Sequence, residues 1–96
     1  MAKGYLIAQI DVNDPETYAG YTAQTPGIAA SYGGAFIVRG GQLAALEGAA
    51  PKGRVVVIEF PSYDQAQNFY NSDEYQAIIG IRHAATTSNV FIVEGP

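Results

Sequence analysis

The segment from Arg54 to Phe60 constrains the fold more than any other part of the sequence, because its centre is a run of four β-branched residues, Val55 to Ile58. This run lacks alternating polar positions, and such continuous apolar strands are typical of a sheet that is covered on both faces. Pro61 ends the strand, since proline lacks the N–H that a sheet ladder needs. The fold must therefore provide cover for both faces of the sheet that contains this strand.

Three other segments are predicted to be strands of the same sheet. In residues 5–12 every even position is apolar, and alternation with a period of two is what a strand requires. Strands are also expected at residues 35–39 and 89–94. After the first of these, the glycine pair 40–41 suits a two-residue hairpin turn that leads to a short edge strand at residues 42–47.

The first helical region is marked by residues that favour a helix start. Asp14 suits the capping position, Pro15 the first helical position, and Glu16 the positive end of the helix dipole. The apolar and aromatic stripe that follows keeps its phase through Pro26. We therefore expect one kinked helix, or two stacked pieces, ending at the glycine pair 33–34.

Two more helices are expected before the last strand. Ser62 with Gln65 forms a capping box, and residues 72–74 start a further helix. That helix carries an inward stripe at spacings of three and four, made of Tyr75, Ile78, Ile79 and Arg82. The resulting order, β-α-β-(β)-β-α-α-β, is the split βαβ pattern of the ferredoxin-like plait. We predict one α+β domain over residues 1–96, with an antiparallel-rich sheet and helices on one face.

Helices on one face leave the other face of the sheet uncovered. The residues expected to face the helices are Leu6, Ala8, Ile10, Phe36, Val38, Val56, Ile58, Phe60, Phe91 and Val93. The opposite positions are still apolar and comprise Tyr5, Ile7, Ala35, Ile37, Val55, Val57, Val90 and Ile92. A patch of several hundred Å² is large for a monomer. At about 25 cal/mol per Å², covering it contributes on the order of 10 kcal/mol before the costs of association.

A second copy of the sheet is the simplest cover, because no further helix remains in the sequence and two-fold symmetry is the commonest arrangement. We therefore expect a homodimer, with interface candidates Tyr5, Ile7, Ile37, Arg39, Val55, Val57, Glu59, Val90 and Ile92. Arg39 and Glu59 share the parity of this set, so we expect them to form an ion pair within or across the interface. If they do not pair, Glu59 in low-dielectric surroundings is the best general-base candidate.

Charge and cysteine content exclude several classes of function. The net charge is −4 and the five Lys and Arg residues are scattered, whereas phosphate backbones are held by clustered basic residues, so we expect no nucleic-acid partner. No stretch approaches the roughly 20 apolar residues of a membrane span, and the first residues lack the features of a signal peptide. The absence of cysteine removes thiolate metal sites and cysteine nucleophiles, and it fits a cytoplasmic location.

Several segments, taken in order along the chain, resemble one known family. They include Ile10-Asp11-Val12-Asn13-Asp14-Pro15, Arg39-Gly40-Gly41, Val55-Val56-Val57-Ile58-Glu59-Phe60-Pro61-Ser62 and Tyr70-Asn71-Ser72-Asp73-Glu74-Tyr75. Together these segments resemble the DUF1330 family of the dimeric α+β barrel superfamily. The resemblance implies that fold, a homodimer, and a pocket between helices and sheet in each protomer. It implies no reaction, because the family has no assigned function and a shared fold does not transfer one.

The superfamily that the resemblance points to includes cofactor-free monooxygenases, haem-degrading enzymes and muconolactone isomerase-like proteins. The sequence has no tryptophan, so it lacks the Asn-Trp-His set associated with the haem-degrading relatives. A single histidine is also poor evidence for a metal site. We therefore expect neither a cofactor nor a metal.

Arg82 is the leading candidate for a ligand anchor, since it shares a helical stripe with inward-facing residues. Its guanidinium could hold a carboxylate or enolate in a bidentate grip, or it could extend to solvent near the helix C-terminus. Tyr70 and Tyr75 flank the junction of the last two helices and are candidate pocket-lining residues. His83 is a candidate for acid–base chemistry, although its position one residue past Arg82 turns it toward solvent or the rim.

Three functions remain open from the sequence. The first is a homodimer that binds a small carboxylate or aromatic molecule in a pocket between helices and sheet. The second is a cofactor-independent monooxygenase or isomerase that uses Arg82 with Tyr70 or Tyr75. The third is a structural or regulatory dimer without a ligand. The sequence decides neither whether the chain is an enzyme nor what its ligand is.

Overall fold

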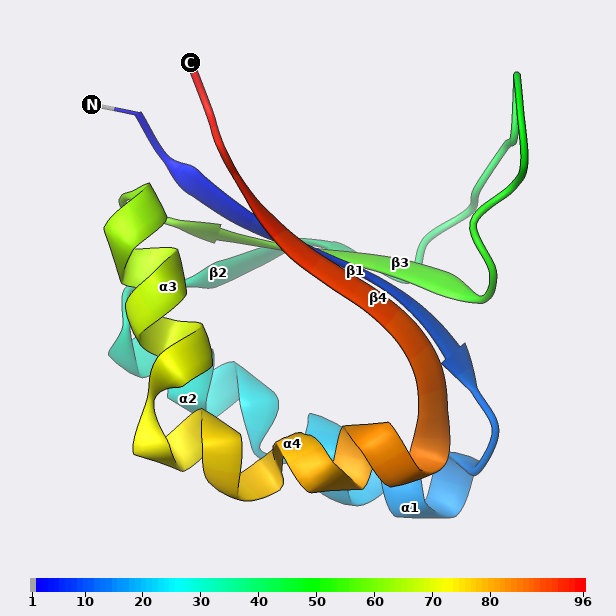
Figure 1. Ribbon diagram of the computed structural model, residues 1–96, viewed down its shortest axis with the longest axis horizontal. Helices are drawn as coiled ribbons and strands as arrows, with labels where there is room; N and C mark the ends of the chain where they lie inside the picture. The colour runs from blue at the N-terminus through cyan, green and yellow to red at the C-terminus, as the bar shows by residue number, and fades with distance from the viewer. Residues whose placement is uncertain (1) are drawn as a thin grey trace.

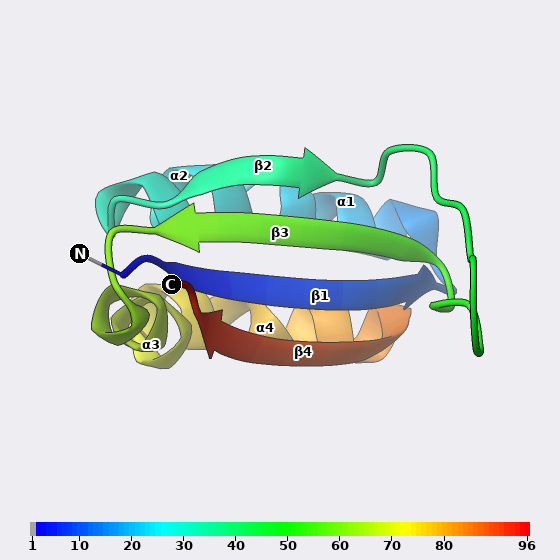
Figure 2. The same cartoon turned by 90° about the horizontal axis from the view of Figure 1, so that it is seen from above.

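The sheet has four strands, and every neighbouring pair is antiparallel. The computed structural model describes residues 2–96. The strand order is β2-β3-β1-β4, with β1 (Gly4–Val12) and β3 (Arg54–Phe60) at the centre and β2 (Ala35–Arg39) and β4 (Thr86–Glu94) at the edges (Figure 2). The β-branched run of the sequence therefore forms a central strand.

The helices lie together on one face of this sheet (Figure 1). They are α1 (Pro15–Thr22), α2 (Thr25–Ser31), α3 (Tyr63–Asn71) and α4 (Asp73–Ala85). This arrangement confirms the predicted ferredoxin-like α+β fold with helices on one face. Within residues 2–96, no helix combines the length and the apolarity that crossing a membrane requires.

Side-chain caps confirm the predicted helix starts. Asp14 Oδ1 accepts the backbone N–H of Thr17 at 3.2 Å, and Ser62 Oγ accepts the backbone N–H of Gln65 at 3.1 Å. The stripe around Pro26 is divided between α1 and α2, so two pieces rather than one kinked helix are present. Pro26 lies in the first turn of α2, where the N–H that proline lacks has no helical partner.

The predicted hairpin after β2 is wrong. Residues 40–53 form a loop without a strand, and the loop projects to the side of the sheet opposite the helices (Figure 1). The expected edge strand has nothing to pack against, since Leu43 is 45% and Leu46 is 88% exposed. Pairing with β3 ends where the Gly40 N–H donates to the Val55 carbonyl at 2.9 Å.

Strand β4 starts three residues earlier than predicted, and its two faces are the reverse of the prediction. Ala8, a core residue of β1, pairs with Val90, and directly paired residues point to the same face of a sheet. Val90 and Ile92, predicted at the dimer interface, therefore face the helices. Phe91 and Val93 lie on the other face and are 47% and 46% exposed. All four are apolar, so alternation alone does not assign their faces.

A register shift in β2 gives Val38 and Arg39 the opposite faces to those predicted. Phe36 faces the core, but the pairing shifts at Ile37, so that Val38 pairs with the outward-facing Val57. Arg39 then points to the helix side, not to the interface face as predicted. Such a bulge reverses the faces of the residues that follow it, and the sequence carries no pattern that marks it.

The remaining outward positions lie where they were predicted. Tyr5 pairs with Glu59 and Ile7 with Val57, all four on the face without helices. Ile37, at the bulge, is 52% exposed. We call this surface the open face; its members are Tyr5, Ile7, Ala35, Val38, Val55, Val57, Glu59, Phe91 and Val93.

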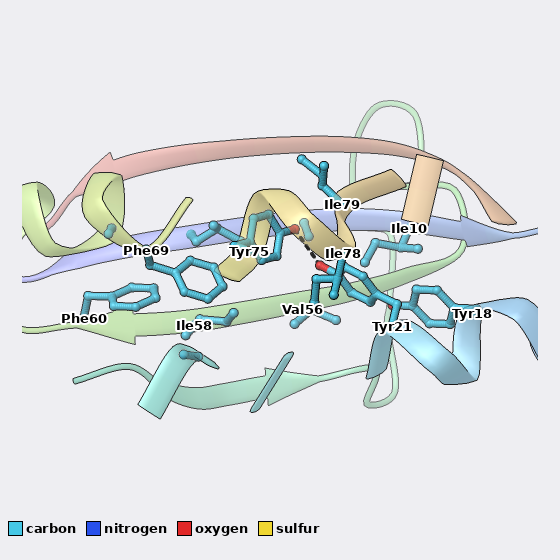
Figure 3. Packing of buried hydrophobic residues seen from close by; sticks show 14 of the residues in the cluster. Ile10, Tyr18, Tyr21, Val56, Ile58, Phe60, Phe69, Tyr75, Ile78 and Ile79 are labelled. Atoms are coloured by element: carbon cyan, nitrogen blue, oxygen red, sulfur yellow. Dashed lines mark hydrogen bonds between the residues drawn. The ribbon is translucent and has the colours of Figure 1, made fainter. Parts of the chain in front are cut away.

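The core lies between the sheet and the helices and is rich in aromatic rings (Figure 3). Its largest fully buried side chains are Phe60, Phe69 and Tyr75. The ring centroid of Phe69 lies 5.1 Å from that of Phe60 and 4.7 Å from that of Tyr75. These contacts fix the junction of α3 and α4 against the sheet.

Candidate functional site

A cleft opens between α1, α2 and the sheet. Its walls are mostly apolar; its cavity volume is about 40 Å³, and the space out to the solvent at its mouth is about 410 Å³. We call it the arginine cleft; its lining residues are Leu6, Ala8, Ile10, Tyr18, Tyr21, Thr22, Thr25, Phe36, Arg39, Arg54, Val56 and Ile58. A concave apolar site with a few polar groups is the usual form of a small-molecule pocket.

Two arginines mark the mouth of the arginine cleft, because Arg39 is exposed and Arg54 is half-buried while most other lining residues are buried. The Arg39 guanidinium carbon lies 4.6 Å from the ring centroid of Phe36, a cation–π distance. Arg54 packs against Gly40, where a Cβ atom would come within 2.8 Å of Arg54 Nη2. Gly40 also has a φ of +69°, so a glycine at this position both permits the turn and leaves room for the guanidinium.

Within residues 2–96, neither of these arginines has a carboxylate partner. Over residues 2–96, the ion pair that forms is Lys3 with Glu59, with 3.7 Å between Nζ and Oε1. The Nε atom of Arg54 is buried and has no hydrogen-bond partner in the described part of the chain. The protein carries a net charge of −4. The cleft thus gathers positive charge in an acidic protein.

Tyrosines form the helix-side wall of the arginine cleft. The rings of Tyr18 and Tyr21 stack with 5.5 Å between centroids. Burial raises the pKa of Tyr18, and the charges of Arg54, Arg82 and Arg39 offset part of that rise. Burial and the neighbouring Tyr75 raise the pKa of Tyr21 well above its usual value. Both phenols are therefore neutral at physiological pH and can donate a hydrogen bond.

Arg82 lies in a second, more open pocket beside β4. This Arg82 pocket is lined by Tyr70, Arg82, His83, Thr86, Ser88 and Val90; its cavity volume is about 310 Å³, and the space out to solvent is about 590 Å³. Arg82 is only 3% exposed, so it does not extend to solvent. Its Nη1 donates to Ser88 Oγ, while its Nε is buried without a partner among residues 2–96.

The structure brings together three of the four predicted ligand-binding residues. Tyr70, Arg82 and His83 line the same pocket, with His83 exposed at its rim. Tyr75 is 2% exposed and does not line it; its hydroxyl oxygen lies 2.6 Å from that of Tyr21 instead. Burial lowers the pKa of Arg82, but the oxygens of Tyr75 and of two other tyrosines raise that pKa by more.

The predicted ion pair between Arg39 and Glu59 is wrong. The bulge turns Arg39 to the helix side, while Glu59 stays on the open face and pairs with Lys3. Sequence reasoning also missed Arg54 and Tyr21 as cleft residues. Strand alternation could have placed Arg54 on the helix side, because it lies two residues before Val56 and so shares the face of the core residues of β3. Among residues 2–96 no group of three or more metal-ligating side chains is gathered.

Comparisons with known proteins agree on the fold. The family model described as "Domain of unknown function (DUF1330)" matches residues 3–96. A protein of unknown function from Rhodopseudomonas palustris superposes with a TM-score of 0.77 at 17% identity, covering 99% of this chain and 82% of that one. No protein with a curated description matches the sequence.

Two further solved structures share the architecture. SnoaB from Streptomyces nogalater, described as a cofactor-independent oxygenase, has a TM-score of 0.69 at 17% identity, over 97% of this chain and 92% of its own. A dimeric ferredoxin-like protein of unknown function from Thermobifida fusca has a TM-score of 0.61 at 17% identity, over 97% and 89%. At these identities the similarity shows the fold alone.

Proposed function

Because the chain belongs to the DUF1330 family, whose description assigns no function, we propose a function from the site itself: the protein binds a small organic anion between its helices and its sheet. The ligand's carboxylate lies at Arg39 and Arg54, and its apolar body lies along the walls of the arginine cleft. The observation that carries this proposal is the pair of arginines at the mouth of an apolar cleft, neither of which has a carboxylate partner in the described part of the chain.

Arg54 supports the proposal most strongly. A buried N–H without an acceptor, such as that of Arg54 Nε, costs about 1–3 kcal/mol of stability. Solubility alone therefore does not explain an arginine at this position. A carboxylate supplies two oxygens in the plane that a guanidinium matches, so it suits the arginines at the mouth of the cleft. Tyr18 and Thr22 add hydroxyl groups to the same cleft. An anion with a short apolar body therefore suits the cleft better than a neutral or cationic molecule.

The first test is calorimetric titration with 4-methylpentanoate, a short branched carboxylate. We expect Arg54→Gln to weaken its binding about 10- to 100-fold, since hydrogen bonds to charged groups contribute about 1.5–3 kcal/mol. Arg39→Gln acts in the same direction but less strongly, because Arg39 is more exposed. Lys52→Gln is the matched control: it removes the same charge from the loop on the opposite side of the sheet and leaves the affinity unchanged.

The neutral analogue 4-methylpentanamide separates charge recognition from simple apolar burial. The wild-type protein is expected to bind the acid more tightly than the amide, and Arg54→Gln is expected to remove that preference. Equal affinities of the wild type for acid and amide would contradict the proposal. Binding that survives both arginine substitutions but fails in His83→Gln or Ser88→Ala would place the ligand in the Arg82 pocket instead.

We also propose that the open face is covered by a second copy of the chain, as a homodimer. The open face carries large apolar side chains that are 42–52% exposed, namely Val38, Phe91 and Val93 together with the adjacent bulge residue Ile37. The loop of residues 40–53 projects to the same side and carries the exposed Leu46 (Figure 1). A sheet face and a loop that both expose apolar groups in one direction fit a self-complementary, two-fold interface.

Cofactor-independent oxidation of the bound molecule is a second candidate function, and the tyrosine hydroxyls at the cleft wall favour it. A reaction of this kind needs a substrate that passes electrons to O₂ itself, such as an electron-rich phenol held as its oxyanion. An oxygen electrode with 1-naphthol as the probe distinguishes the two functions. Binding alone leaves the rate of oxygen uptake at its protein-free value, whereas an oxygenase raises it.

A further inference from the structure

Arg82 is a buried cation that has no carboxylate to balance its charge. Its side chain is 3% exposed, and within residues 2–96 it forms no ion pair. Arg82 lies in the last turn of α4, where a positive charge is favoured, but the interaction with a helix end is weaker than the cost of taking a cation out of water. Its hydrogen-bond partner, the Ser88 hydroxyl, is neutral. The described residues therefore balance the charge of Arg82 only in part.

Ser88 adds a second hydrogen-bond donor beside the guanidinium. Because a guanidinium has donors only, Ser88 Oγ must be the acceptor of the bond from Arg82 Nη1, and the hydroxyl keeps its own proton. The neighbouring Thr86 Oγ1 lies 3.3 Å from Ser88 Oγ, beyond the usual range of about 2.5–3.0 Å for two hydroxyl oxygens, and it donates to the Arg82 carbonyl at 2.7 Å. The Ser88 proton therefore makes no short hydrogen bond among the described residues.

These two donors lie at the wall of the Arg82 pocket. Arg82 and Ser88 both line it, and the hydrogen bond between them places the guanidinium at that wall. The cavity volume of about 310 Å³ is several times the roughly 30 Å³ that one water occupies in the liquid, so the pocket has room for a polyatomic ion. Apart from Val90, every lining residue carries a polar group, and no Asp or Glu of the described chain lines the pocket.

We propose that the Arg82 pocket is a second anion site, which binds a tetrahedral oxyanion: free phosphate or the phosphate group of a small ester. Its polar walls offer little apolar surface to an alkyl chain, unlike those of the arginine cleft. Donors from two different side chains suit an ion that accepts hydrogen bonds in several directions. The site does not depend on the proposed function, because Arg39 is on β2 and Ser88 is on β4, the two opposite edges of the sheet (Figure 2).

The test is calorimetric titration with inorganic phosphate in a buffer that contains no other oxyanion. Ser88→Ala is expected to weaken phosphate binding about tenfold, as the loss of a hydrogen bond to a charged group usually does. Arg82→Lys keeps the charge but loses the planar fork, and it is expected to weaken binding at least as much. Arg39→Gln is the control: it removes a positive charge from the opposite edge of the sheet and leaves the affinity for phosphate unchanged. If Arg82→Lys does not fold, Ser88→Ala alone decides.

Titrating the same variants with 4-methylpentanoate separates the two sites. Ser88→Ala is expected to leave the affinity for this acid unchanged, while Arg39→Gln weakens it. The inference is overturned if the wild type does not bind millimolar phosphate, if Ser88→Ala binds phosphate as the wild type does, or if Arg39→Gln abolishes phosphate binding. Phenyl phosphate identifies the source of the oxyanion: severalfold tighter binding than inorganic phosphate indicates an ester, and equal or weaker binding indicates the free ion.

Discussion

Val57→Asp is expected to convert the proposed homodimer to a monomer. Val57 lies on central strand β3 and is paired on the open face with Ile7 on one side and Val38 on the other. In the proposed homodimer, two-fold symmetry places a carboxylate from each copy inside an apolar interface, and the effective penalty for burying an ion is several kcal/mol. We therefore expect the dimer to dissociate over a thousandfold more readily than the wild type.

Sedimentation velocity at matched micromolar concentrations measures this change. Ala77→Asp is the control: it places the same charge on an exposed position of α4, on the helix side, and the dimer is expected to persist. Phe91→Asp on β4, with a side chain that is 47% exposed, is expected to act as Val57→Asp does. A far-ultraviolet spectrum like that of the wild type shows that the monomer is folded. A Val57→Asp protein that sediments as an intact dimer would show that the open face is not the interface.

Phe69→Ala is expected to cost about 3–5 kcal/mol of the free energy of unfolding, the usual range for removing a buried phenylalanine side chain. Phe69 is 1% exposed, and its ring contacts those of Phe60, Tyr75 and Tyr32 at centroid distances of 5.1, 4.7 and 6.3 Å. Because Tyr75 loses its closest aromatic neighbour, we also expect weaker positioning of its hydroxyl against Tyr21.

Urea unfolding at a fixed protein concentration measures the loss, since the proposed dimerisation would make the apparent stability depend on concentration. Tyr63→Ala provides a matched control on the same helix, with an aromatic side chain that is 37% exposed. It is expected to change the free energy of unfolding by less than about 1 kcal/mol, as surface substitutions usually do. Equal losses for the two variants would mean that the aromatic cluster is not the main packing contact of α3.

Local signals in the sequence predicted most of the fold. The β-branched run of β3, the alternation of β1, the caps Asp14 and Ser62, and the helix start at residues 72–74 each act within a few residues, and each is found where it was expected. The inward position of Arg82 was predicted from helical spacing alone, since positions 75, 78, 79 and 82 share one face of the helix. These elements are determined by propensity and periodicity, which a single sequence displays.

The errors arose where a neighbouring strand decides the outcome. Strand β4 is apolar on both faces, so only its pairing with β1 shows that Val90 faces the helices. The bulge at Ile37 changes the face of the sheet to which Arg39 points, and no pattern in the sequence marks the bulge. Residues 42–47 have the composition of a short strand, but no strand within residues 2–96 pairs with them. Because Arg39 was assigned to the wrong face, the arginine cleft could not be assembled from the sequence.

A crystal structure of the protein with 4-methylpentanoate bound decides whether the arginine cleft holds the anion. Density for the acid is expected in the arginine cleft, with its carboxylate oxygens within hydrogen-bonding distance of the Arg39 and Arg54 guanidinium groups and its alkyl chain against Tyr18. A carboxylate bound at Arg82 and Ser88, or a cleft filled by its own side chains at saturating acid, would contradict it.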